Sequence, residues 1–177
     1  MILHLTRKVQ NVNKIKVVAQ PQTESNCYFN NWYVDIFSTG FKGKSALVFM
    51  HDMSRLPISI PGKSLQKAIP PFLEQLKLHL LNWGISNEEI ENELTAANKI
   101  VYAPTSNKSI LGSINNIKLN AEYSLTYNYT DYGSIDWAKI NLHMSVHLFS
   151  VKGKGHFWSD KIIREHYGLL EKPKKWG

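Results

Sequence analysis

A histidine followed two residues later by a hydroxyl side chain occurs at His4 and Thr6, and again at His143 and Ser145. In an extended segment, residues two apart project from the same side, so each pair presents an imidazole beside a hydroxyl. Two histidines of opposite protonation can act as general base and general acid near neutral pH, while hydroxyls hold a phosphate. These four residues are the candidate catalytic residues of a metal-independent phosphodiesterase or ribonuclease.

The same residues also have a purely structural interpretation. The form of the two pairs resembles the repeated motif of two-histidine phosphoesterases, which implies acid–base chemistry at a phosphate. The chain has seven histidines, however, so such pairs also arise without function. His143 and its neighbours are then exposed residues of a strand, and His4 belongs to a strand edge. The sequence leaves both interpretations open.

No metal site and no cofactor are predicted. His143 and His147 are four residues apart, and in the strand predicted there they would be separated by about 13 Å. That distance is too long for two ligands of one ion. The glycine-containing stretch VKGKGHFW (151–158) lacks the pattern of a phosphate-binding P-loop and predicts a basic hairpin.

The net charge of +7 and the isoelectric point near 9.4 favour a polyanionic partner, either RNA or DNA. Basic residues concentrate near both ends of the chain, so we expect one basic surface if the ends converge. The candidate nucleic-acid-binding residues are Arg7, Lys8, Lys42, Lys44, Lys108, Lys152 and Lys154. There are two alternatives: a basic protein that binds no nucleic acid, and an accessory protein that acts through a protein partner.

Length and composition predict one domain. The 177 residues, of which 43% are hydrophobic and 20% charged, suit a single globular core. Neither a long apolar run nor a signal-peptide pattern is found, so we expect a cytoplasmic protein with no membrane association. The single cysteine, Cys27, cannot form an internal disulfide.

Three strands are predicted in the first third of the chain, over 32–40, 45–51 and 56–61. Pro57 and Pro61 lack amide donors, which places the third strand at a sheet edge. A fourth strand is expected over 99–104.

Helices are predicted over 64–83, 86–97 and 107–125, and a last one from Ser159. Within 64–83, the main helix should begin near Pro70 after a preliminary turn, because proline is tolerated in the first turn of a helix but not in its interior. SNEE (86–89) is a capping box, which gives the acidic cluster a structural role. Gly112 lies inside a helix and predicts a close backbone approach.

The alternation INLHMSVHLF (140–149) predicts a further strand with one apolar and one polar face. The resulting fold class is α+β, a single domain with a mostly antiparallel sheet of four to six strands. Three to four helices are expected to pack on one face of that sheet.

Three stretches together resemble domain of unknown function 6933, an uncharacterised and mainly bacterial family. They are MILHLTRKV at the start, NWYVDIFSTGFKGKSALVFMHD (31–52) and NKSILGSINN (107–116), and the match covers about residues 1–125. Where the family has arginines, this chain has Lys42 or Lys44 and Lys108, and His51 replaces an asparagine. Arginine's planar fork and lysine's point charge are not interchangeable at an anion.

The resemblance implies no established activity. It singles out His4 and Thr6 but not His143, which favours a role for the N-terminal segment alone, such as a structural bond from His4 to the 107–116 helix. The resemblance implies only the fold of the family and a candidate functional surface.

Overall fold

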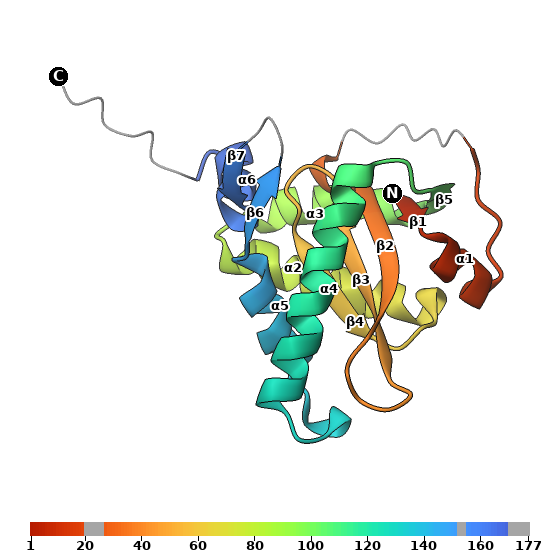
Figure 1. The fold of residues 1–177 in the computed structure, drawn as a ribbon. Coiled ribbons are helices and arrows are strands. Elements are labelled where there is room, and N and C mark those ends of the chain that lie inside the picture. Colours follow the sequence, from red (N-terminus) through yellow and green to blue (C-terminus); the bar gives the residue numbers. More distant parts are fainter. Residues whose placement is uncertain (20–26, 152–154, 170–177) are drawn as a thin grey trace.

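A five-stranded sheet forms the centre of the computed structural model, which describes residues 1–19, 27–151 and 155–169 (Figure 1). The strand order is β4-β3-β2-β1-β5. The strands are β1 (Ile2–Leu5), β2 (Asn31–Ser38), β3 (Ser45–His51), β4 (Pro57–Pro61) and β5 (Val101–Pro104). The predicted strands over 32–40, 45–51, 56–61 and 99–104 are thus present, and β4 lies at an edge as its prolines indicate.

The opening strand β1 lies between β2 and β5 and pairs with both in parallel. The β2–β3 and β3–β4 pairings are antiparallel. The sheet is therefore mixed, and the prediction of a mostly antiparallel sheet is wrong in this respect. The reason is that β1 pairs with segments far away in the chain, which local sequence patterns cannot reveal.

The described residues form six α-helices where the sequence predicted three to four. They are α1 (Arg7–Asn13), α2 (Leu65–Asn82), α3 (Asn87–Thr95), α4 (Lys108–Asn128), α5 (Trp137–Ser145) and α6 (Ser159–His166). The basic C-terminal tail expected over 171–177 lies outside the described residues. No helix in the described part of the chain is long and apolar enough to cross a membrane.

Helices cover both faces of the sheet, which corrects the prediction that they pack on one face. One core joins Leu3, Val34 and Phe49 to the buried sides of α1, α2, α3 and α6. The other core joins Tyr33 and Val48 to α4 and α5. Because side chains alternate along a strand, β2 and β3 supply apolar residues to both cores.

The helix α2 is continuous from Leu65, so the expectation of a start near Pro70 is wrong. Ser64 caps it by accepting a hydrogen bond from the Lys67 amide, and both Pro70 and Pro71 lie inside the helix. The capping box at the start of α3 is confirmed, with Ser86 and Glu89 bonded reciprocally.

The acidic cluster is structural, as predicted. Besides the capping box, the buried Glu93 carboxylate accepts hydrogen bonds from the backbone amides of Tyr28 (3.0 Å) and Phe29 (2.9 Å). Glu91 pairs with Lys77 at 2.8 Å. These carboxylates are therefore bound to amides and cations of the fold itself.

The strand predicted over 140–149 is wrong. The segment forms helix α5, capped by Asp136, and only its end contributes to a strand, β6 (Leu148–Val151). Ile140 and Met144 are four apart and therefore fit one face of a helix as well as an alternating strand. The predicted hairpin is present, since β6 pairs with β7 (Gly155–Trp158).

The prediction of a close approach at Gly112 is wrong, and a close approach is found at Gly40 instead. A Cβ on Gly112 would meet nothing within 4 Å among the described residues. A Cβ on Gly40 would lie 2.1 Å from the Thr126 side chain, and Gly40 also has a φ of +80°. The β2–β3 turn can therefore pack on α4 only with glycine at position 40.

Two histidines are buried in neutral form. His51 is fully buried, with Nε2 donating to the Tyr28 carbonyl (2.9 Å) and Nδ1 accepting from the Ser54 hydroxyl (2.8 Å). Burial lowers the pKa of His51 to about 3 and that of His79 to about 4. Nε2 of His79 is buried with no hydrogen-bond partner in the described chain. Both imidazoles therefore resist protonation in the folded protein.

The side chain of Asn141 replaces a strand at the outer edge of β4. Its Oδ1 accepts from the Ser59 amide (2.7 Å) and its Nδ2 donates to the Ser59 carbonyl (3.0 Å), all in the interior. We expect Asn141→Ala to lower the free energy of unfolding by about 2–4 kcal/mol, because two buried backbone groups lose their partners. Urea unfolding measures this. The exposed Lys139→Ala on the same helix is the control, and an equal loss there would contradict the assignment.

Stability should fall as pH drops below about 6.5. The unfolded histidines bind protons there, whereas folded His51 and His79, with lowered pKa values, do not, so acid favours unfolding. Each histidine should contribute about 1.4 kcal/mol per pH unit between pH 6.5 and 4.5. In urea unfolding at a series of pH values, His79→Leu should remove about half of this slope. The exposed His156→Gln should leave it unchanged; an unaltered slope in His79→Leu would refute the explanation.

Candidate nucleic-acid interface

His4 lies in β1, an interior strand of the sheet, and is half-buried. Its ring stacks on Tyr33, with centroids 4.5 Å apart. Nδ1 donates to the Pro104 carbonyl at 3.3 Å, and Nε2 lies 3.3 Å from Oδ1 of Asn31. Both ring nitrogens thus have partners within the fold, and these partners are on β2 and β5, not on the 107–116 helix expected from the resemblance.

Thr6 begins α1 and joins it to the sheet. Its hydroxyl donates to Oδ1 of the buried Asp35 (2.7 Å) and accepts the hydrogen bond from the Val9 amide that caps α1. The second carboxylate oxygen of Asp35 accepts from Nζ of Lys118 on α4 at 2.6 Å. The Thr6 hydroxyl therefore links α1, β2 and, through Asp35, the ammonium on α4.

The structure does not bring His143 and Ser145 to His4 and Thr6. Helix α4 lies between α5 and β1 (Figure 1). Ser145 is buried and donates its hydroxyl proton to the Leu142 carbonyl at 2.8 Å, while His143 is exposed. Helix α4 thus separates His143 and Ser145 from His4 and Thr6.

His143 and His147 line the same groove instead of sharing one face of a strand. The helical turn brings both to one groove of about 470 Å³ between α4 and α5, and the charge of His143 contributes to lowering the pKa of His147, although burial is the main cause. The separation of about 13 Å applies to a strand, and this segment forms helix α5 and the turn after it instead. No group of three metal-ligating side chains occurs within residues 1–19, 27–151 and 155–169.

The predicted basic residues that the structure describes lie on α1, in the β2–β3 turn and at the start of α4. Arg7 and Lys8 are exposed on α1, and Nζ of Lys8 donates to the Ile36 carbonyl on β2 (3.1 Å). Lys42 and Lys44 are exposed in the β2–β3 turn, and Lys108 is exposed at the start of α4. Lys152 and Lys154 lie outside the described residues.

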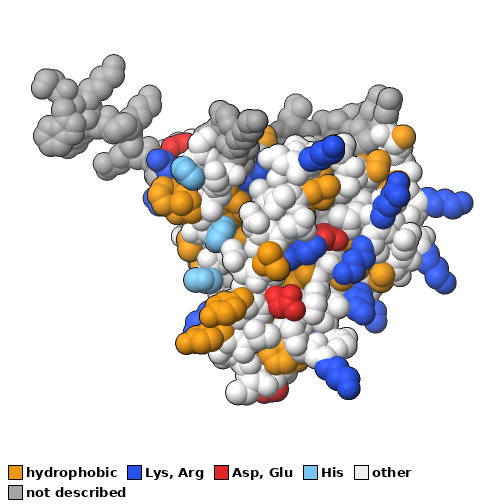
Figure 2. Space-filling view, in the orientation of Figure 1, with side chains coloured by type: hydrophobic (Ala, Val, Ile, Leu, Met, Phe, Trp, Pro, Cys, Tyr) orange, Lys and Arg blue, Asp and Glu red, His pale blue; other side chains and the backbone are white. Residues whose placement is uncertain are grey.

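The described parts of the two basic chain ends do not converge. Helix α1 lies on one side of α4, whereas β6, β7 and α6 lie on the other side (Figure 1). Figure 2 shows Lys and Arg side chains gathered on the side of α1 and β2, with few acidic side chains among them. We define the α1 basic surface as the cationic side chains of α1, of the segment that follows α1, and of the segment before α2 that Asn13 binds. They are Arg7, Lys8, Lys14, Lys16 and Lys63.

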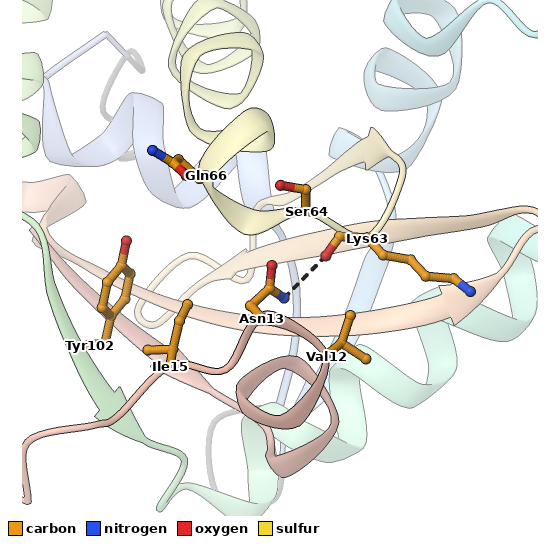
Figure 3. Close-up of a pocket in the computed structure, with 7 residues that line it drawn as sticks. All are labelled: Val12, Asn13, Ile15, Lys63, Ser64, Gln66 and Tyr102. Carbon is orange, nitrogen blue, oxygen red and sulfur yellow. Dashed lines mark hydrogen bonds between the residues drawn. The ribbon is translucent and has the colours of Figure 1, made fainter.

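A groove of about 590 Å³ lies within this surface (Figure 3). It runs between the end of α1, the start of α2 and β5. One wall carries the apolar side chains of Val12 and Ile15 and the half-buried ring of Tyr102. The opposite wall is polar and is made by Lys63, Ser64 and Gln66. The groove thus offers a flat aromatic ring, amide and hydroxyl groups, and positive charge.

Asn13 holds the two walls of the groove together. Its Nδ2 donates to the Lys63 carbonyl (3.1 Å) and to the Val9 carbonyl (3.0 Å), and its Oδ1 accepts from the Leu65 amide (2.8 Å). The bond to Lys63 is visible as the dashed line in Figure 3. One amide side chain therefore fixes the end of α1 against the first turn of α2.

Sequence reasoning missed most of this groove. Lys14 and Lys16 belong to the basic N-terminal end of the chain, whereas Asn13, Lys63 and Tyr102 carry no local sequence signal. They come from three segments that are 39 or more positions apart and carry no common motif. The one local signal was Thr6, an N-cap residue followed by a short polar run, which is typical of a helix start.

The chain belongs to the family described as Domain of unknown function (DUF6933), whose model matches residues 2–162. The match thus extends beyond the 1–125 expected from the sequence, through α5 and into α6. A search of curated proteins finds no match.

Among solved structures, the chain is similar to one in a cryoEM structure of the simian T-cell lymphotropic virus intasome in complex with PP2A regulatory subunit B56 gamma. The identity is 14% and the TM-score 0.39, over 87% of this chain. The match spans 62% of the other chain's length.

Asn13→Ala should loosen the groove. The variant leaves the Lys63 carbonyl and the Leu65 amide without their partner, and we expect the free energy of unfolding to fall by about 1–2 kcal/mol, since both groups are only partly buried. Thermal or urea unfolding measures this. Asn11→Ala, at an exposed position of the same helix, should change it by less than about 0.5 kcal/mol. Equal effects of the two variants would show that Asn13 does not fasten the groove.

Proposed function

We propose that the protein binds nucleic acid, with single-stranded RNA as the favoured ligand, through the α1 basic surface and its groove. The observation that carries the proposal is that a groove with an aromatic wall opens within a cluster of exposed cations. Ammonium and guanidinium groups attract phosphates and release counterions, whereas aromatic rings stack on bases. The two features supply the two parts of single-strand binding at one place.

The shape of the surface favours a single strand over a duplex. Helix α1 has only seven residues and is held along β2 by the Lys8 and Thr6 bonds, so it does not project as a recognition helix for a major groove. A base released from stacking could enter the groove against Tyr102, with Gln66 as a partner for its edge. Ser64 and Gln66 offer partners for a ribose 2′-hydroxyl, which favours RNA.

The charge balance near the groove supports the same conclusion. Residues 1–16 contain four cations and no acid. Asp35, which bonds the Thr6 N-cap of α1, is buried and already paired with Lys118. The cations of α1 and the following segment are therefore left available for phosphates.

Fluorescence anisotropy of a labelled oligouridine, measured over a range of salt concentrations, tests the proposal. Lys14→Gln/Lys63→Gln should weaken binding about tenfold and reduce the slope of log affinity against log salt by about 1.4, because each phosphate contact of a single strand contributes about 0.7. The charge-matched control Lys139→Gln/Lys161→Gln alters exposed lysines elsewhere.

The control should leave affinity and slope nearly unchanged. Binding that does not weaken as salt rises, or an equal loss in the two double variants, would contradict a phosphate-led mode at the α1 basic surface. A duplex of the same length that binds more tightly than the single strand would contradict the choice of ligand.

A further inference from the structure

A second cavity, of about 330 Å³, lies between the β3–β4 turn and the β7–α6 segment. It shares no lining residue with the α1 groove. Its lining residues are Met53, Arg55, His156, Phe157, Trp158, Lys161, Ile162 and Glu165. Its volume is near the lower end of the range of about 300–1,000 Å³ that is typical of small-molecule sites.

Arg55 is the buried charge of this cavity. The residue is only 5% exposed, and its backbone has a φ of +60°, in the left-handed region that non-glycine residues rarely occupy. The β3–β4 turn thus places a guanidinium inside the protein at the cost of an unusual backbone conformation. Such conformations are retained where the surrounding structure enforces them, often at binding sites.

The charge of Arg55 is incompletely compensated. Nη1 donates to the Asp52 carbonyl, but the nearest Asp52 carboxylate oxygen is 3.7 Å away and that side chain is 40% exposed. Nη2 reaches the Ser109 hydroxyl at 3.5 Å, and Nε is buried with no partner in the described chain. Burial lowers the pKa of Arg55, which reflects the cost of holding this cation in the interior. An anion at the cavity would lower that cost.

Basic groups outnumber acidic groups among the residues that line the cavity. Lys161 and His156 are exposed at its rim, and Glu165 is the one carboxylate among the described lining residues. Two permanent cations and an imidazole therefore face a single acid. This balance favours an anionic ligand over a cationic or neutral one.

The remaining walls are apolar and accessible. Trp158 is 46% exposed and Met53 is 61% exposed. Both side chains line the cavity, so a bound ligand could cover them. Phe157 and Ile162 continue this wall. A flat apolar group could lie against the indole of Trp158 while an attached anionic group reaches the cationic end.

We propose that this cavity binds a small organic anion, namely a phosphomonoester or carboxylate carried on a flat apolar group. Arg55 and Lys161 bind the anionic group, since a guanidinium presents donors in a fork that matches phosphate and carboxylate oxygens. Trp158 stacks on the flat group. The site is separate from the α1 basic surface, so RNA and this ligand do not compete.

Isothermal titration calorimetry with phenyl phosphate as the probe tests the site in the full chain. Phenyl phosphate should bind saturably, and phenol and inorganic phosphate should each bind at least about tenfold more weakly, because each lacks one half of the ligand. Quenching of tryptophan fluorescence gives a second readout. Benzoate in a parallel titration distinguishes a carboxylate from a phosphate ligand.

Two substitutions on α6 should have opposite effects. Lys161→Gln removes an attractive charge and should weaken phenyl phosphate binding about fivefold to tenfold, whereas Glu165→Gln removes the repelling carboxylate and should strengthen it severalfold. Asp52→Asn, which takes the nearest carboxylate from Arg55, should also strengthen it. Trp158→Ala should weaken binding of phenyl phosphate more than that of inorganic phosphate. Lys139→Gln is the control and should change nothing.

The absence of saturable phenyl phosphate binding, or phenol binding as tightly as phenyl phosphate, would overturn the proposal. So would equal affinities in Lys161→Gln and Glu165→Gln. Lys161→Gln should leave oligouridine binding unchanged, so this site and the proposed RNA surface fail or succeed independently.

Discussion

The structure depends on burying both faces of the central sheet. Parallel pairing of β1 with β2 and β5 places the opening strand in the interior of the sheet, and helices cover it on both sides. Strands buried on both faces must be apolar almost throughout, as β3 is. Asp35 is the exception in β2, and it is tolerated because Thr6 and Lys118 bond both of its oxygens. The polar network thus ties α1 and α4 to opposite sides of one strand.

This arrangement also decides where ligands could bind. Because helices cover both faces of the sheet, the accessible grooves with polar or charged side chains lie between neighbouring helices, strands and turns. The α1 groove lies at one such border, beside β5 and the start of α2. The Arg55 cavity lies at another, where the β3–β4 turn meets β7 and α6. The two proposed sites therefore share no lining residue and use different chemistry, exposed lysines in one and a buried guanidinium in the other.

Local patterns predicted the elements better than their arrangement. Alternation predicts β2, and a short continuous apolar run predicts β3. Serine and glutamate at the right spacing predict the capping box of α3, and prolines predict the edge position of β4. The helix α5 was missed because Ile140 and Met144 fit both periods. The site was only partly predictable: charge indicated Arg7 and Lys8, but the bonds of Asn13 and the placement of Arg55 arise from contacts between distant segments that no spacing encodes.

The edge strand β4 is protected against intermolecular pairing. In its antiparallel pairing with β3, Ile58 and Ile60 direct their backbone groups inward, so positions 57, 59 and 61 direct theirs outward. Two of these positions are prolines without an amide hydrogen, and Asn141 occupies both groups of the third. A strand from another molecule would find no free donor along this edge. The docking of α5 therefore also acts as a safeguard against self-assembly into fibrous aggregates.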